Sequence, residues 1–452
     1  MNHVSVSTHR PDARRARLAL ILALLLALCL PGQAFAAFAP GAAQVDALIS
    51  QVATWESAQL AGQTQGPTYG NEWALMALSR AGKLSDALKQ QYLANLARHL
   101  KNNGGSLGNT VTDYDRVILA LTSMGVDATD FAGVNLTAPL ASFDDINSQG
   151  VSGVIYALLA LDSHNYPTPS LLAGSAETPT TREALVSALL DAQLAAGGWN
   201  WGWGDAADPD LTSMAICALV PYYHTGNAQI DAAIDDALTV LGTIQDDATA
   251  GFTSDWSPTP ASESSAQALV ALSSLGVAID DARFVKAGGN LYDSLTGFLI
   301  DAKPDVKAFV DYAGDAAPSG MATEQGLYAL VAFSRSLTAA NRLYDMTDIT
   351  LQPFVSPPNG GGTGGGATGG GNGTGGSTGG NGGNNTGSDR PADGAGSPSI
   401  VATKPATTLP AAGDTTERAA LVSSLLLSAG TIVVLMAWSA SRRHAKRRSA
   451  DD

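Results

Sequence analysis

The stretch QLAAGGWNWGWGDAADPDLTSMAICALVPYY, from Gln193 to Tyr223, determines the predicted fold. A helix ends within it at the glycine pair Gly197-Gly198, because glycine takes a left-handed turn at little steric cost. Three tryptophans follow in a glycine-rich loop, and an Asp-Pro-Asp sequence then gives the start signal of a second helix. The stretch therefore predicts a unit of helix, glycine-rich aromatic loop and helix.

An apolar phrase of five residues recurs through the chain, and one copy of it lies in the second helix of this unit. The last residues of successive copies are 40 to 61 residues apart, which leaves room for one further helix and its loops in each repeat. The sequence therefore predicts about six helix pairs, whose apolar phrases are Ala74–Leu78, Val117–Leu121, Ala157–Leu161, Ala215–Leu219, Ala268–Leu272 and Ala329–Phe333.

The segments between these phrases have the periodicity of amphipathic helices, as at Leu88, Leu96 and Leu100. The phrase helices are apolar nearly all round, so we expect them inside and the amphipathic helices outside. Helix pairs of this kind stack in an open solenoid or close into a ring, and closure removes two exposed ends. We therefore predict an all-α fold without strands, an α/α toroid of inner and outer helices over residues 37–353.

When the six copies are aligned on the apolar phrase, the same aligned position ahead of the phrase can be compared in all of them. Five of the six residues at this position have a hydroxyl or carboxylate group. Such groups accept hydrogen bonds from the unpaired amides at a helix amino terminus, or favour its partial positive charge. We therefore predict that five of these residues cap inner helices and that only the tyrosine departs from the pattern; the set is Tyr69, Thr112, Ser152, Asp210, Glu263 and Glu324.

The amino terminus has the layout of a secretory signal. Basic residues between Arg10 and Arg17 precede the apolar run Leu18–Leu30, and Ala34-Phe35-Ala36 provides a small-residue cleavage site. We predict cleavage after Ala36, so that residues 1–36 are a signal peptide and the rest of the chain is exported.

A second apolar run, Ala419–Ala440, is long enough to span a bilayer and is followed by a basic tail. Before it stand Leu409, Pro410, Ala412 and Gly413 of an LPxxG sequence. Residues 409–452 resemble a sortase cell-wall sorting signal of Gram-positive bacteria, except that Ala412 replaces the usual threonine. The resemblance implies attachment to peptidoglycan at the cell surface of a Gram-positive bacterium, and the span predicts membrane anchoring by itself.

The linker and the charge of the exported part limit its partners. Residues 354–408 are rich in glycine, asparagine, threonine and serine, which predicts a disordered tether. Without the terminal segments, the 25 basic and 41 acidic residues of the chain fall to 16 and 38, a net charge of −22. This charge argues against nucleic acid as a partner. Cys29 leaves with the signal peptide, so Cys217 has no disulfide partner.

Gln193, Gly197 and Trp199 have the Q-x3-G-x-W spacing of the repeat in terpene cyclases of the squalene-hopene type. The chain also resembles bacterial surface proteins with prenyltransferase/squalene-oxidase repeats and, in architecture, the helical domain of animal cobalamin carriers. The resemblance implies the α/α toroid that these cyclases share with protein prenyltransferase β subunits. It also implies that Gln193 and Trp199 are structural, tying an outer helix to the loop that follows.

Three kinds of catalysis are alternatives to the cap interpretation. The sequence from Asp208 to Leu211 gives only part of the DxDD motif of a class II cyclase, in which Asp210 would be the general acid. A protein prenyltransferase needs a zinc site of Asp, Cys and His, and the residues here have no such spacing. Glycan cleavage needs two carboxylates about 5 to 10 Å apart, and the predicted ring of caps includes carboxylates on one rim.

Binding is the remaining interpretation and the one we favour over a cyclase or prenyltransferase-like enzyme. One mouth of the ring would combine aromatic walls with acidic groups and form a ligand cleft. The protein would then be a surface-anchored domain for an extracellular ligand or partner, whether a corrinoid, lipid, glycan or protein, with no cofactor and no metal. The predicted contacts are Trp73, Tyr114, Tyr156, Trp201, Trp203, Asp210 and Glu263.

Overall fold

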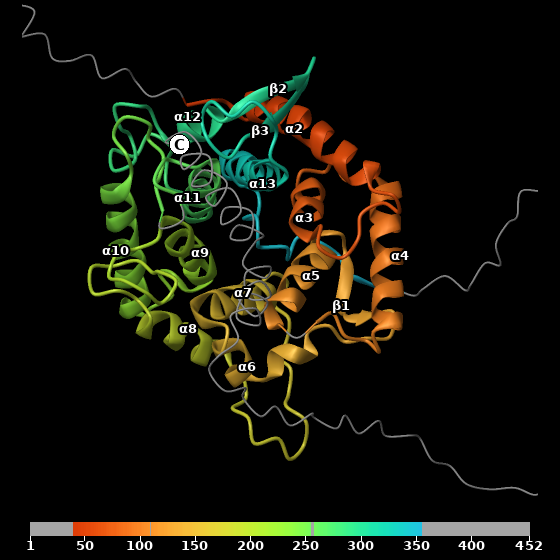
Figure 1. The fold of residues 1–452 in the computed structure, drawn as a ribbon. Helices are drawn as coiled ribbons and strands as arrows, with labels where there is room; N and C mark the ends of the chain where they lie inside the picture. The colour runs from red at the N-terminus through yellow and green to blue at the C-terminus, as the bar shows by residue number, and fades with distance from the viewer. Residues whose placement is uncertain (1–38, 109, 255–256, 355–452) are drawn as a thin grey trace, which may run out of the picture. The chain divides into compact units, whose positions relative to one another are not determined.

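The computed structural model describes residues 39–108, 110–254 and 257–354. This part of the chain is predominantly helical, as the sequence predicts, with a few short strands (Figure 1). The predicted signal peptide, the linker, the LPxxG sequence and the apolar run Ala419–Ala440 lie outside the described residues. Within them, no helix has both the length and the apolar character that crossing a membrane requires.

Six helices each contain one copy of the apolar phrase and contact one another in series. The last of them contacts the first, so the series is closed (Figure 1). Every residue of the fourth is buried, as expected for a helix packed on several sides. These inner helices are α3 (Glu72–Arg80), α5 (Val111–Ser123), α7 (Gly150–Asp162), α9 (Pro209–Leu219), α11 (Ser262–Leu275) and α13 (Gly320–Leu337).

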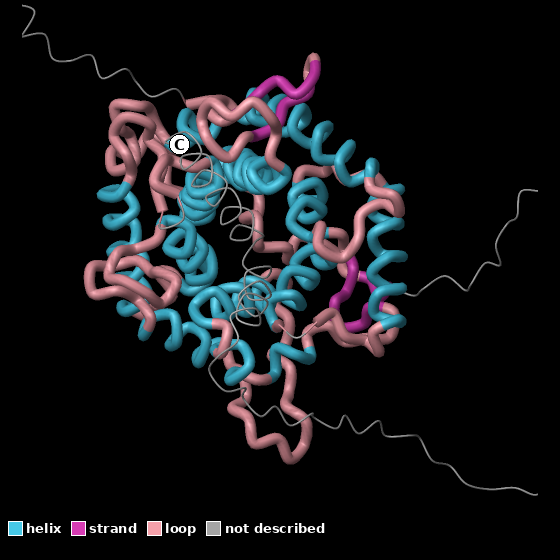
Figure 2. Tube along the Cα trace, in the orientation of Figure 1, coloured by secondary structure: helices cyan, strands magenta, loops and turns pink. Residues whose placement is uncertain are grey.

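The other helices lie around the inner ones (Figure 2). They bury one face only: in the helix over 228–244 the buried residues recur at helical spacing, from Ile230 and Ile234 to Leu238 and Leu241. The short ones occupy places where the chain between two inner helices is mostly loop. These outer helices are α2 (Ala42–Gly62), α4 (Asp86–Asn102), α6 (Phe143–Asn147), α8 (Arg182–Asp191), α10 (Ala228–Ile244) and α12 (Leu291–Thr296).

The prediction of a fold without strands is wrong. Strands β2 (Leu299–Lys303) and β3 (Val306–Phe309) form an antiparallel hairpin, and β1 (Val126–Phe131) pairs in parallel with β4 (Gln352–Phe354). All four are short, and β1 and β4 come from opposite ends of the domain. Their pairing therefore depends on the fold bringing distant segments together, and no local pattern announces it.

The predicted caps are also wrong. The N-cap residues of the inner helices are Asn71, Thr110, Gln149, Asp208, Ala261 and Ser319. Thr112, Ser152, Asp210, Glu263 and Glu324 lie inside the helices, and Tyr69 lies before one. The helices begin at different distances from their apolar phrases, so alignment on the phrase does not locate their starts. Asp210 and Glu263 still lie in a first turn, where the helix dipole favours a negative charge.

The chain after α13 runs back across the last turns of the inner helices. The amide of Met346 donates to the carbonyl of Ser163, just after α7, at 2.7 Å. Arg80, the last residue of α3, donates to the carbonyls of Arg342 and Asp345, both at 2.8 Å. These bonds fix the segment across one end of the ring. At the opposite end the first turns of the inner helices are left to form a site.

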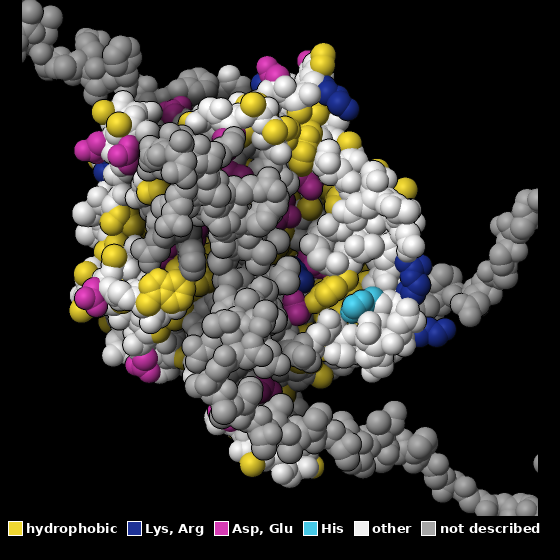
Figure 3. All heavy atoms as spheres, viewed as in Figure 1, with side chains coloured by type: hydrophobic (Ala, Val, Ile, Leu, Met, Phe, Trp, Pro, Cys, Tyr) yellow, Lys and Arg dark blue, Asp and Glu magenta, His cyan; other side chains and the backbone are white. Residues whose placement is uncertain are grey.

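Charged side chains are spread over the face of the domain drawn in Figure 3. Asp and Glu side chains are visible both at the edge of this face and nearer its middle, among apolar ones, and most of the Lys and Arg side chains in view lie at the edge.

Candidate functional site

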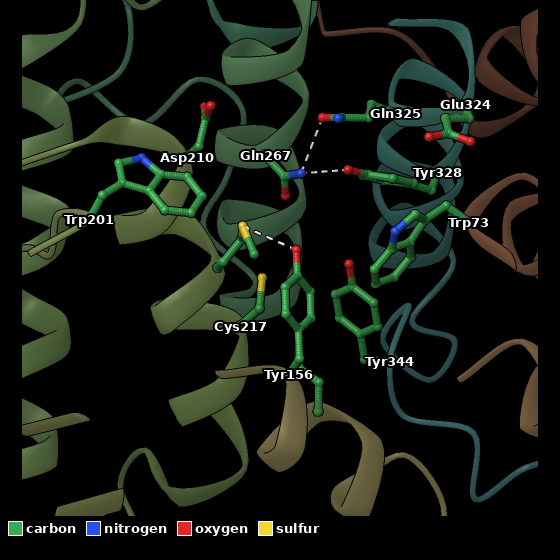
Figure 4. A pocket seen from close by; sticks show the side chains of 12 residues that line it. Trp73, Tyr156, Trp201, Asp210, Cys217, Gln267, Glu324, Gln325, Tyr328 and Tyr344 are labelled. Atoms are coloured by element: carbon green, nitrogen blue, oxygen red, sulfur yellow. Dashed lines mark hydrogen bonds between the residues drawn. The ribbon is translucent and has the colours of Figure 1, made fainter. Parts of the chain in front are cut away.

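A pocket lies among five of the six inner helices, with no contribution from α5 (Figure 4). Its cavity is small, about 30 Å³, which is room for only one or a few groups of the size of a water molecule. Aromatic rings, two glutamines and two carboxyl groups line it. The lining residues are Trp73, Tyr156, Leu159, Trp201, Asp210, Met214, Cys217, Gln267, Glu324, Gln325, Tyr328 and Tyr344.

The aromatic walls are in mutual contact. The ring centroid of Trp73 is 5.6 Å from that of Tyr156 and 6.4 Å from that of Tyr328, both in tilted arrangements. The side-chain amide of Gln267 donates to Gln325 at 3.2 Å and to the hydroxyl of Tyr328. Gln267 and Gln325 therefore hold α11 and α13 in register across the pocket (Figure 4).

Asp210 presents a carboxyl group to one side of the pocket (Figure 4). The preceding Asp208 takes the capping role, accepting from the amide of Leu211 at 2.9 Å, and this leaves Asp210 in the first turn of α9. Only 7% of Asp210 is exposed, and its Oδ1 has no hydrogen-bond partner among the described residues. Burial raises its pKa to about 8, the charge of Asp208 adds to the rise, and a hydrogen bond with Ser264 opposes it.

Glu324 lies on the opposite side of the pocket (Figure 4). Burial raises its pKa to about 8, and the charges of Glu56 and Glu72 act in the same direction against the opposing charge of Arg116. At neutral pH both lining carboxyl groups are therefore largely protonated in the empty pocket. They can donate a hydrogen bond as acids or become anions when a positive charge arrives.

More carboxyl groups surround the pocket behind these two. Burial raises the pKa of Asp115 and of Glu263 well above the ordinary range, and that of Glu56 to about 7. Neither oxygen of Asp115 has a hydrogen-bond partner among the described residues. In contrast, Glu72 is held by Arg116 at 2.8 Å. Among the residues that line the pocket, none is Lys, Arg or His.

The structure brings part of the predicted site together. Trp73, Tyr156, Trp201 and Asp210 line the pocket. The other three predicted contacts do not: Tyr114 accepts from the amide of Leu107 at 3.1 Å, Trp203 is 50% exposed, and Glu263 is buried beside Asp311.

Several lining residues were missed as contacts. Glu324 and Tyr328 lie one helical turn apart on the same face of α13, and this i, i+4 spacing is a signal that could have marked them. Gln267 is a polar residue beside an apolar phrase, which is a weaker signal. Tyr344 comes from the segment after the last phrase, and nothing in its neighbourhood in the sequence indicates that it reaches the pocket.

The residues of the Q-x3-G-x-W spacing lie outside the pocket and connect outer helices. Gln193 donates from its side-chain amide to the carbonyl of Ala233 in α10 at 2.8 Å. Trp199 is fully buried, and its ring nitrogen donates to the carbonyl of Leu189 in α8 at 2.7 Å. Gly197 has φ of 90° and packs against α10, where a Cβ would lie 3.1 Å from Asp236.

A second pocket, of about 450 Å³, lies at the other end of the inner helices. Leu159, Cys217 and Tyr344 line both pockets, so these side chains form the partition between them. The charged groups of the second pocket are paired: Arg182 bonds to Asp162 at 2.6 Å, and Arg342 lies 3.8 Å from Asp345.

Across the described parts of the chain, no group of three or more His, Cys, Asp or Glu side chains is arranged to hold a metal ion. Cys217 is buried, and burial raises the pKa of its thiol to about 12, which disfavours the nucleophilic thiolate. The arrangement is suited to binding, or to proton donation by a carboxylic acid.

Comparisons with known proteins give a distant similarity in structure. No protein-family model matches the sequence, and no curated protein matches it. Among solved structures, the chain is similar to Candida albicans protein geranylgeranyltransferase-I complexed with GGPP. That similarity has a TM-score of 0.43 and 13% sequence identity, and it covers 64% of this chain and 92% of the other.

Proposed function

We propose that this domain is an α/α toroid of inner and outer helices that binds a ligand without catalysis. The ligand would bind in the pocket among the inner helices that Asp210 and Glu324 line, which we call the axial pocket. The observation that carries the proposal is Asp210, a buried carboxyl group that faces a pocket with aromatic walls and has an oxygen atom without a partner. A buried polar atom without a hydrogen bond costs free energy, and a bound ligand can recover that cost.

The size of the pocket bears on the ligand. Sites that enclose a drug-sized molecule measure about 300 to 1,000 Å³, whereas this cavity measures about 30 Å³. The pocket therefore suits one protruding group of a ligand better than a complete corrinoid or isoprenoid. We propose that the rest of the ligand lies outside the cavity.

Acid catalysis on an isoprenoid is the second candidate, and the chemistry of Asp210 favours it. A carboxylic acid that remains protonated at neutral pH has a proton to donate to an alkene, and the rings of Trp73, Tyr156 and Tyr328, which line the same pocket, could stabilise a cation. The test is incubation with squalene: cyclised products that vanish in Asp210→Asn would favour this candidate over binding.

The location of the protein is a proposal based on the sequence alone. We propose export by residues 1–36 and retention at the cell surface by the apolar run Ala419–Ala440. Fractionation of a Gram-positive host separates wall from membrane retention. If a sortase reads the LPxxG sequence, Ala412→Thr increases the wall-bound fraction; an unchanged fraction would indicate retention by the span alone.

The binding proposal is tested by tryptophan fluorescence, because Trp73 and Trp201 line the pocket. The full-length chain is titrated with cyanocobalamin, farnesol, muropeptides and n-butylamine. Any class that gives a saturable change is then measured by calorimetry in Trp201→Ala and in Trp203→Ala. We expect weaker binding in the first variant and unchanged binding in the second, which alters an exposed residue of the same loop.

An equal loss of binding affinity in Trp201→Ala and Trp203→Ala would place binding in the loop and not in the pocket. No saturable response from any of the four classes would overturn the proposed function.

A further inference from the structure

We infer that the axial pocket selects a primary alkylammonium group, which is held against Asp210 among the aromatic rings. This inference rests on the proposed function and adds the chemical class of the ligand. It is carried by three features of the pocket: the charge of its lining, its aromatic walls and its size.

The charge of the lining has one sign. Asp210 and Glu324 contribute carboxyl groups, and none of the twelve lining residues is basic. Both carboxyl groups that line the second pocket, at the other end of the inner helices, have an arginine beside them: Asp162 has Arg182 at 2.6 Å and Asp345 has Arg342 at 3.8 Å. The counter-charge that the axial pocket lacks is the charge that a cationic ligand supplies.

The groups facing the two carboxyls strengthen this preference. Asp210 is faced by Asp208 on its own helix, by Glu263 of α11, and by the hydroxyls of Tyr156 and Tyr328. Glu324 is faced by Glu56 of α2 and Glu72 of α3, and by Arg116 of α5, which is itself paired with Glu72 and Asp113. One arginine thus stands among these seven carboxyl groups.

The walls and the volume identify the kind of cation. Trp73, Tyr156 and Tyr328 line the pocket, and the face of an aromatic ring attracts a positive charge through its quadrupole. A primary ammonium is compact, carries three hydrogen-bond donors, and ends a slender chain. A primary ammonium therefore suits a cavity of about 30 Å³, with its chain leaving through the mouth, better than a bulkier quaternary ammonium or a planar guanidinium does.

Calorimetry on the full-length chain at pH 7 tests the inference with n-butylamine and its neutral analogue 1-butanol. We expect n-butylamine to bind at least about tenfold more tightly than 1-butanol. Asp210→Asn should weaken n-butylamine binding by about 10- to 100-fold, the effect of one hydrogen bond between charged groups. Glu324→Gln, which replaces the carboxyl group on the opposite side of the pocket, should weaken n-butylamine binding by only a few fold.

These variants exchange an acid that is neutral in the empty pocket for a neutral amide, so the fold should tolerate them. The control is Asp301→Asn, which removes one negative charge from an exposed position in the middle of β2, beside Lys307. It should leave n-butylamine binding unchanged. Equal weakening in Asp301→Asn and Asp210→Asn would overturn the inference, because net charge alone would then attract the amine.

A further arm compares n-butylamine with N-acetyl-lysine methylamide. Equal binding would assign the site to a lysine side chain of a protein, and preference for n-butylamine would assign it to a small free amine; both results support the ammonium class. If 1-butanol, farnesol or muropeptides bind in the pocket and n-butylamine does not, the ammonium class of ligand is overturned and the proposed binding function stands. If no probe binds, both the ammonium class and the binding function are overturned.

Discussion

The two ends of the inner helices hold their carboxyl groups differently. At the last turns, Asp162 is bonded to Arg182 at 2.6 Å and to the hydroxyl of Tyr222 at 2.8 Å. At the first turns, the Oδ1 atom of Asp210 and both oxygens of Asp115 have no hydrogen-bond partner among the described residues. At the last turns the acids are paired with arginines, whereas at the first turns Glu72 is paired with Arg116 but Asp210 and Asp115 keep oxygen atoms without a hydrogen bond among the described residues.

This difference separates structural from functional charge. A paired acid such as Asp348 ties the segment after α13 to the inner helices. Removing its partner would only destabilise the domain. An unpaired buried acid costs stability while the pocket is empty, so its presence calls for an explanation beyond the fold. The helix dipole favours Asp210 at the start of α9, but it provides no hydrogen bond to Oδ1.

The largest expected effect comes from removing the arginine of the acidic end. Arg116→Leu leaves Glu72 and Asp113 without their ion-pair partner, and should cost about 3 to 5 kcal/mol of unfolding free energy in urea denaturation. Arg342→Leu, at the paired end, removes a contact of 3.8 Å from a partly exposed side chain and should cost less than about 1 kcal/mol. Equal costs would contradict the contrast between the two ends.

The next effect is a loss of stability as pH rises. The pKa of Asp210 is raised in the folded chain to about 8 from 3.8, so the folded state holds the proton more tightly. The stability this gives is complete below pH 3.8 and is lost as pH rises toward 8. Asp210→Asn should reduce the fall in unfolding free energy between pH 5 and pH 8 by roughly 2 to 4 kcal/mol.

A smaller effect separates the tryptophans of the loop. Trp199→Phe removes the donor to the carbonyl of Leu189 from a fully buried site, and should cost about 1 to 3 kcal/mol. Trp203→Phe, at a half-exposed position, should change the unfolding free energy by less than about 0.5 kcal/mol. Thermal denaturation of both variants gives the comparison, and a reversed order would show that the loop packs differently.

The smallest effect is expected at the paired end. Asp348 accepts from Arg80 and Arg335, both at 3.1 Å, but its side chain is 40% exposed. Asp348→Asn should therefore cost less than about 1 kcal/mol. Burial acts to raise its pKa, but the charges and hydrogen bonds of Arg80 and Arg335 together outweigh burial and lower the pKa, so its contribution to stability is lost only as pH falls below the ordinary range of Asp. Between pH 5 and pH 8, the pH dependence of the unfolding free energy of Asp348→Asn should match that of the wild type.

The helical fold was predictable because each inner helix repeats an apolar phrase that no surface helix would have. The residues at which these helices begin were not predictable, because the distance from the apolar phrase to the N-cap varies between helices. In α9 this variation displaced the predicted cap from Asp208 to Asp210. The strands β1 and β4 escaped prediction because only tertiary packing brings Val126 and Gln352 together.

The candidate site was predictable where a residue stands out within a repeat, as Trp73, Trp201 and Asp210 do. The candidate site was not predictable where the position of a residue depends on the path of an irregular segment. Tyr344 follows the last helix, and only the fixing of its neighbour Met346 to Ser163 brings it beneath the pocket. The lack of a basic partner for Asp210 is likewise a property of the assembled ring.

The most direct test of this account is the number of protons released when n-butylamine binds at pH 7. Calorimetry in two buffers of different ionisation enthalpy gives this number. An empty pocket holding a protonated Asp210 should release about one proton per bound amine as the carboxyl group becomes an anion, and Asp210→Asn should release close to none. Binding without proton release, or with equal release in the variant, would contradict the account.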